Sequence, residues 1–123
     1  MKTILVVDDD DAIRRVLRKM LEQAGHRVVE AESAAAAMAA VTGDDPPHAV
    51  VSDVLMPGKT GLVFYDELVA VAPALSNRVI FLTGAARDRG VHDKIEELGV
   101  PLLAKLDDLQ LVVDAVRFAL LRR

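Results

Sequence analysis

The feature that most constrains this chain is a regular alternation of short apolar runs with longer segments of helical periodicity. The apolar runs predict strands at residues 4–7, 27–30, 49–53, 78–83 and 102–104. Apolar residues spaced three and four apart predict helices at about 11–24, 33–43, 60–72, 87–98 and 108–121. The strand runs lack polar alternation, which is typical of strands buried on both faces. We therefore expect an α/β fold of five β–α units, with a parallel sheet between two layers of helices.

The predicted helix ends rest on capping residues. Asp11 is placed to cap the first helix and Ser33 to cap the second, because their side chains can accept hydrogen bonds from free N–H groups of a first turn. Gly25 is expected to end the first helix. Met56, Pro57 and Gly58 are predicted to form a turn after the third strand.

Size and charge narrow the functional classes. The chain has 123 residues, which predicts one domain over residues 1–123, and a net charge of −4, which argues against nucleic acid as a partner. There is no cysteine, so disulfides and thiolate metal sites are excluded. No apolar run approaches a membrane span, and the first apolar run is too short for a signal peptide. We expect a cytoplasmic protein that does not contact membranes.

Polar residues follow several predicted strands directly, and these are the candidate functional residues. They are Asp8 and Asp9 after the first strand, Asp53 at the end of the third, Thr83 at the end of the fourth and Lys105 after the fifth. Ligands of open parallel sheets bind at the carboxyl ends of the strands, so these groups should converge. Carboxylates packed together repel one another, and oxygen ligands without His or Cys favour Mg²⁺ as the neutralising cation.

The combination of these residues resembles the receiver domain of two-component response regulators. The resemblance is carried by Val6-Val7-Asp8-Asp9, by Asp53 followed by Met56-Pro57-Gly58 and Gly61, by Phe81-Leu82-Thr83-Gly84, and by Lys105. It covers essentially the entire chain. It implies a flavodoxin-like (βα)5 three-layer sandwich with a parallel five-stranded sheet of order 2-1-3-4-5.

The resemblance also implies a role for each site residue. Asp53 would accept a phosphoryl group from a phosphohistidine of a sensor histidine kinase or a phosphotransfer protein. Mg²⁺ would be bound directly by Asp9, Asp53 and the backbone carbonyl of Leu55, and through water by Asp8. Lys105 would neutralise charge on the phosphoryl group, and the Thr83 hydroxyl and the Gly84 N–H would donate to it. Such a protein would catalyse its own phosphorylation and dephosphorylation without being a conventional turnover enzyme.

Two positions depart from the family pattern. The family usually has proline after the strand-five lysine, with a cis peptide bond, whereas Leu106 follows Lys105 here. A cis bond before a non-proline residue costs about 3–4 kcal/mol, so a trans bond and a less firmly placed Lys105 are expected. The family also often has Tyr or Phe at the position of Leu102, where the ring reports the switch.

The last predicted helix has two apolar lines. Its core stripe comprises Leu109, Val112, Val113, Val116 and Leu120. A second line, formed by Leu111, Ala115 and Phe118, predicts a homodimer or a contact with an output partner. Simple tolerance of exposed apolar residues is the competing interpretation.

Three alternatives stay open at this stage. Asp10 and Asp11 can be explained as a solvated helix start alone, without a role in the site. Asp8, Asp9 and Asp10 also fit the Asp-x-Asp nucleophile motif of haloacid-dehalogenase-type phosphatases, although Asp53 and the Met-Pro-Gly turn would then be unexplained. Finally, a receiver-like domain can dock a partner without being phosphorylated.

Overall fold

The computed structural model describes residues 2–56, 58–84, 89–105 and 107–122. Its elements, in chain order, are β1 (Thr3–Val7), α1 (Asp11–Gln23), β2 (Arg27–Ala31), α2 (Ala34–Thr42), β3 (Ala49–Asp53), β4 (Leu55–Met56), β5 (Lys59–Thr60), α3 (Gly61–Val71), the 3₁₀ turn η1 (Pro73–Leu75), β6 (Val79–Thr83), α4 (Arg89–Leu98), β7 (Leu102–Ala104) and α5 (Gln110–Leu120). The predicted start of the fourth helix at Arg87 lies outside the described residues.

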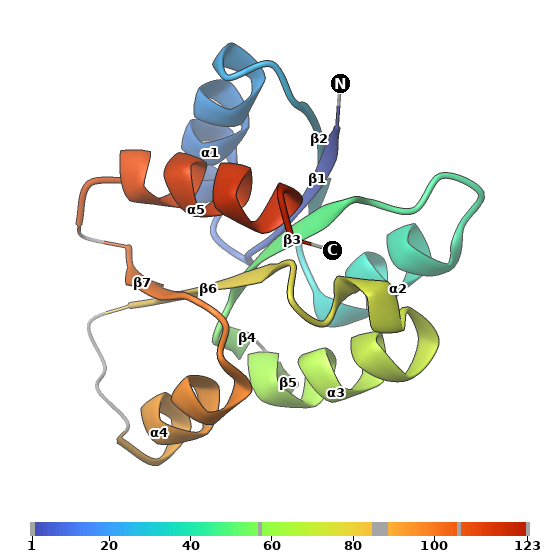
Figure 1. Ribbon diagram of the computed structural model, residues 1–123, viewed down its shortest axis with the longest axis vertical. Coiled ribbons are helices and arrows are strands. Elements are labelled where there is room, and N and C mark those ends of the chain that lie inside the picture. The colour runs from blue at the N-terminus through green and yellow to red at the C-terminus, as the bar shows by residue number, and fades with distance from the viewer. Residues whose placement is uncertain (1, 57, 85–88, 106, 123) are drawn as a thin grey trace.

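Five of the strands form one parallel sheet in the order β2-β1-β3-β6-β7 (Figure 1). Counted along the main sheet alone, this is the predicted order 2-1-3-4-5, so the predicted flavodoxin-like topology is confirmed. The strand order reverses between β1 and β3, which places the carboxyl ends of these two strands side by side. Such a switch point is where open α/β sheets bind their ligands.

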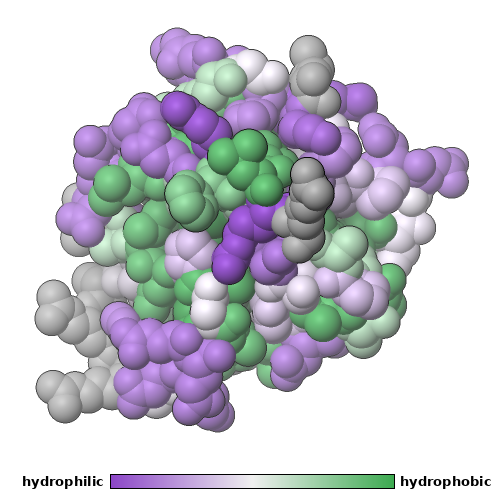
Figure 2. Space-filling view, in the orientation of Figure 1, coloured by the Kyte–Doolittle hydropathy of each residue, from purple (hydrophilic) through white to green (hydrophobic). Residues whose placement is uncertain are grey.

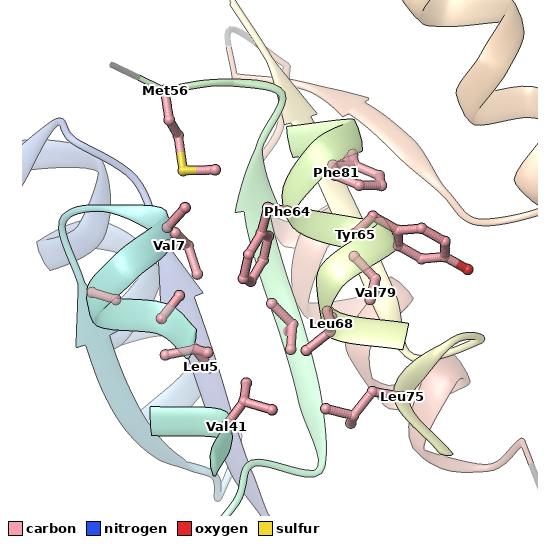
Figure 3. Close-up of a cluster of buried hydrophobic side chains, with 14 of the residues drawn as sticks. Leu5, Val7, Val41, Met56, Phe64, Tyr65, Leu68, Leu75, Val79 and Phe81 are labelled. Atoms are coloured by element: carbon pink, nitrogen blue, oxygen red, sulfur yellow. The ribbon is translucent and has the colours of Figure 1, made fainter. Parts of the chain in front are cut away.

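Helices cover both faces of the sheet, and strand residues alternate between two cores. On one face, Leu5, Val50 and Phe81 pack with residues of α2, α3 and α4, and Figure 3 shows Phe64 and Leu68 of α3 lying against β3 in this core. On the other face, Val51 and Leu82 pack with α1 and α5. Burial on both faces explains why the strands lack polar residues in alternation.

The helix boundaries correct one prediction and confirm another. Asp10, not Asp11, caps α1, because Asp10 has extended backbone and its side chain accepts from the N–H of Ala12 at 2.9 Å. Asp11 is the first helical residue. Ser33 caps α2 as predicted. Gly25 follows α1 with φ 97°, a left-handed conformation that suits glycine at the end of a helix.

The predicted turn after the third strand is a short antiparallel hairpin, in which β4 pairs with β5. Gly58 lies in the turn between these strands, and Pro57 is outside the described residues. Among the described helices, none is both long and apolar enough to cross a membrane.

Candidate functional site

Three aspartates converge at the carboxyl ends of β1 and β3. Asp8 and Asp9 follow β1, and Asp53 is the last residue of β3. One carboxylate oxygen from each lies within 4.8 Å of the other two. Asp8 and Asp53 are only 1% and 5% exposed, whereas Asp9 is exposed. The predicted convergence of these carboxylates is therefore present in the structure.

Lys105 joins the two buried carboxylates. Its Nζ lies 2.8 Å from Asp8 Oδ2 and 2.9 Å from Asp53 Oδ2, and it donates a hydrogen bond to the latter. Burial alone lowers the pKa of Lys105, but the contacts with Asp8 and Asp53 outweigh burial, so the net shift is upward. Lys105 is therefore an ammonium at neutral pH. The predicted trans bond to Leu106 lies outside the described residues.

The buried Asp8 carboxylate is incompletely satisfied. Its Oδ1 accepts from the N–H of Asp10 at 2.9 Å, but Oδ2 accepts no hydrogen bond from any described residue and has only the ion pair with Lys105. Burial raises the pKa of Asp8, and the contact with Lys105 opposes part of that rise. A buried carboxylate oxygen whose one partner is an ammonium, placed beside two other carboxylates, fits a hard divalent cation, whose preferred ligands are oxygens.

Asp53 is held by its own neighbours in the chain. Its Oδ1 accepts from the N–H of Leu55 at 3.2 Å, and its backbone carbonyl accepts from the buried Ser52 hydroxyl at 3.0 Å. The backbone N–H of Leu55 thus lies next to the carboxylate, while the Leu55 side chain is exposed.

Gly61 is crowded against the strand that carries Asp53. A Cβ added to Gly61 would lie 2.7 Å from the backbone oxygen of Asp53 and 3.0 Å from both Val54 Cα and the Phe81 ring. The N–H of Gly61 also donates to the Val54 carbonyl at 2.7 Å. Only glycine lets α3 begin this close to the end of β3.

Thr83 and Gly84 lie at the neighbouring strand end. Asp53 pairs in register with Leu82, so Thr83 stands one residue beyond the partner of Asp53. The Thr83 hydroxyl has only a long contact of 3.5 Å, to the Gly84 carbonyl, among the described residues. The Thr83 backbone carbonyl accepts from the N–H of Lys105 at 2.9 Å, which ties this strand end to the lysine.

Sequence reasoning missed Arg14, which is buried beside the acidic loop, residues 8–10 between β1 and α1, and donates to the backbone carbonyl of Asp8. The available signal was its spacing, because Arg14 shares the inward face of α1 with Leu17 and Leu21. A charged residue on a core-facing line needs partners.

The two aspartates of the phosphatase alternative, Asp8 and Asp10, have different environments in the structure. Asp10 would be the second aspartate of that motif, but its carboxylate accepts from the N–H groups of Ala12 and Ile13 as a helix cap. A carboxylate oxygen of Asp53 instead lies within 4.8 Å of carboxylate oxygens of both Asp8 and Asp9.

Comparison with known proteins identifies the family. The model of the response regulator receiver domain matches residues 4–117, and the chain belongs to this family. It is 33% identical over 86 residues to the response regulator receiver protein CpdR of Brucella abortus, a match that covers 70% of this chain and 69% of CpdR. It is 34% identical over 82 residues to the C4-dicarboxylate transport transcriptional regulatory protein DctD of Rhizobium meliloti, covering 67% of this chain and 17% of DctD.

A solved structure of a receiver domain has the same fold as this chain. A response regulator receiver domain protein from Clostridium thermocellum superposes with a TM-score of 0.85 at 26% identity, covering 98% of this chain and 94% of that one. The chain is thus a receiver domain of two-component signal transduction, a class of signalling phosphoacceptors that bind Mg²⁺ at an acidic pocket. The match spans about a sixth of the length of DctD.

Proposed function

We propose that residues 1–123 form one receiver domain whose phosphoacceptor is Asp53. The observation that supports this best is the pairing of Lys105 with Asp53 and Asp8 beside a third carboxylate, Asp9. A carboxylate alone at a strand end is a common turn residue, but a partly buried lysine bridging two buried carboxylates from different strands is a costly arrangement. Such an arrangement is expected at a site that handles a highly charged group.

In the proposed reaction, a carboxylate oxygen of Asp53 attacks the phosphorus of a phosphohistidine. The new O–P bond makes an acyl phosphate as the P–N bond breaks, and the imidazole leaves with the electron pair of that bond. Lys105 is already within hydrogen-bond distance of the Asp53 carboxylate. Its ammonium can therefore also pair with the phosphoryl oxygens as negative charge develops on them. Thr83 has a hydroxyl without a strong partner among the described residues, and we assign it and the Gly84 N–H as donors to the phosphoryl group.

We assign Asp9, Asp53 and the Leu55 carbonyl as the groups that would hold Mg²⁺ directly, with Asp8 supporting them through water. The oxygen-only donor set and the clustering of three carboxylates around one ammonium support this assignment. Bound Mg²⁺ supplies positive charge that stabilises the transferred phosphoryl group. The residues of the chain do the remaining work of placing the nucleophile and the donors.

A sensor histidine kinase or a phosphotransfer protein is the phosphoryl donor that the family supports, and we place the exchange in the cytoplasm on the same ground. DctD is named as a transcriptional regulatory protein, so some relatives act on transcription. The net charge of −4 favours an output of this domain through protein contacts rather than through nucleic acid.

The predicted partner surface lies on α5. Leu111 and Phe118 are 45% and 73% exposed, which supports the predicted second apolar line, and apolar residues gather over α5 in Figure 2. Ala115 is instead half-buried against the core, because the core stripe of this helix is wider than predicted. Asp114 and Arg117 lie beside the exposed pair, so the face offers both charges to a second copy of itself. We propose that this face forms a homodimer when Asp53 is phosphorylated.

Phosphorylation of Asp53 is tested by incubating the protein with acetyl phosphate and Mg²⁺ and measuring its intact mass. We expect one added phosphoryl group, which hydroxylamine removes because it cleaves acyl phosphates. Asp53→Asn should abolish the addition, whereas Asp66→Asn, which changes an exposed aspartate of α3, should not. Labelling that persists in Asp53→Asn contradicts the assignment.

A further inference from the structure

Arg14 is a buried charged residue to which the proposed phosphotransfer chemistry gives no role. It lies on the same face of α1 as the buried Leu17 and Leu21. Removing a guanidinium from water is costly unless its donors are paired. The partners of Arg14 therefore show what this position requires.

Each nitrogen that can donate from the tip of Arg14 has a different acceptor. Nη1 donates to the backbone carbonyl of Asp8, Nη2 pairs with the Asp11 carboxylate, and Nε donates to Glu30 Oε1 at 3.2 Å. Helical side chains lean toward the N-terminus of their helix, which brings this guanidinium back beneath the acidic loop. A single side chain thus ties the loop to both α1 and β2.

These contacts hold Asp8 from two sides. Its N–H donates to the Ala31 carbonyl of β2 at 3.1 Å, and its own carbonyl accepts from Arg14. Glu30, which pairs with Arg14, precedes Ala31 in the same strand. The position of the loop is therefore set by β2 through one direct hydrogen bond and one contact that passes through Arg14.

Asp9 has no such support of its own. Within the described part of the chain, its carboxylate makes no hydrogen bond or ion pair, although it faces Asp8 and Asp53 within 4.8 Å. Its place is fixed by its neighbours, because Asp10 donates to Asp8 Oδ1 and Asp8 is bound by Arg14. A shift of the Asp8 backbone would move both carboxylates of the loop.

We infer that Arg14 is a positioning residue for the divalent cation. By holding the Asp8 carbonyl, it sets where the carboxylates of Asp8 and Asp9 lie relative to Asp53, and so it sets the affinity for Mg²⁺. This inference rests on the proposed function, since it takes these three carboxylates as the cation site. Groups that orient metal ligands typically change metal affinity by about 10–100-fold when they are removed.

The test is calorimetric titration of the variants with Mg²⁺ alone. Arg14→Met should weaken binding by about tenfold, the lower end of that range. Arg14→Lys should fall between Arg14→Met and the parent, because an ammonium can reach one acceptor but lacks the planar fork that serves three. If the Arg14→Met variant is folded and binds Mg²⁺ as tightly as the parent, the inference is overturned.

Arg18→Met is the matched control. Arg18 pairs with the same Glu30, at 2.7 Å, but it lies one turn further along α1 and has no contact with the acidic loop in the described structure. The Mg²⁺ affinity of the Arg18→Met variant should match that of the parent protein. Unfolding in urea with EDTA is measured for both variants, because a merely structural role would lower stability without changing the affinity of the folded protein.

Two further variants keep the result decisive. If Arg14→Met does not fold, Glu30→Gln replaces it, since it weakens the hold on Arg14 Nε. Weaker Mg²⁺ binding by Glu30→Gln supports the inference, and unchanged binding overturns it. Asp9→Ala tests the site itself. If Asp9→Ala binds Mg²⁺ as tightly as the parent, the proposed cation site fails, whereas loss of binding there with unaltered Arg14 variants refutes only the role of Arg14.

Discussion

Lys105 is the residue on which the charge of the metal-free site depends. Among the described residues, its ammonium is the only cation that contacts the carboxylates of Asp8 and Asp53, and both carboxylates are buried. Removing one partner of a buried ion pair leaves an uncompensated charge, which typically costs about 3–5 kcal/mol. Stability at this site should therefore be linked to the cation.

We predict that Lys105→Met lowers the free energy of unfolding in EDTA by about 3 kcal/mol. Saturating Mg²⁺ should recover much of this loss, because a bound cation stabilises the folded state and neutralises the same oxygens. Urea denaturation in both conditions measures the difference, with Lys94→Met on the exposed side of α4 as the control. An equal loss with and without Mg²⁺ would show that uncompensated carboxylates are not its cause.

Among the elements, the contact between β3 and the start of α3 places the site. Gly61 has no room for a Cβ against backbone atoms of Asp53 and Val54, which cannot move aside as a flexible side chain could. Its hydrogen bond to the Val54 carbonyl fixes the same junction. The distance between α3 and β3 is therefore set by the absence of a side chain at Gly61.

Gly61→Ala should destabilise the fold by about 1–3 kcal/mol, the usual cost of overpacking. It should also slow phosphorylation, because the backbone of Asp53 must shift to admit the methyl group. Urea denaturation and the rate of phosphorylation by acetyl phosphate measure the two effects. Gly43→Ala, whose added Cβ would lie 3.3 Å from its nearest neighbour, should be far milder on both. Equal behaviour of the two variants would refute the argument from crowding.

At the scale of the whole molecule, the exposed side of α5 is the surface on which two copies should meet. Phe118→Glu should keep the protein monomeric in the presence of Mg²⁺ and beryllofluoride, because it places a charge in the apolar centre of the proposed contact. Phosphorylation of Asp53 should be unaffected. Sedimentation velocity of both forms measures the change in assembly.

Val71→Glu is the control for that experiment, since Val71 is 55% exposed but lies on α3. It should not alter assembly. A parent protein that stays monomeric at high concentration with and without beryllofluoride contradicts the homodimer. The exposed pair on α5 would then be available only to a different partner.

The sheet and the convergence of Asp8, Asp53 and Lys105 could be predicted from sequence for one physical reason. Strands buried on both faces must be apolar, so polar residues mark where the strands end, and parallel strands end at one edge. The cap of α1 was misassigned because Asp10 and Asp11 are equally good capping residues and only backbone conformation separates them.

The contacts of Arg14 could not be predicted from local spacing. Its partner Glu30 lies sixteen residues further along the chain, in a strand whose position beside β1 is known only once the sheet is formed. The half-burial of Ala115 was likewise missed, because the width of an apolar stripe depends on how deeply the helix settles on its sheet.

The lysine bridge described above implies an order of events at the site. Three carboxylates and one ammonium leave two negative charges in the metal-free site, which one divalent cation balances. A phosphodonor is itself an anion, and an anion approaching such a site is repelled until the balance is restored. The cation should therefore bind first and the phosphodonor second. At a low concentration of Mg²⁺, the domain should then not accept a phosphoryl group from its donor.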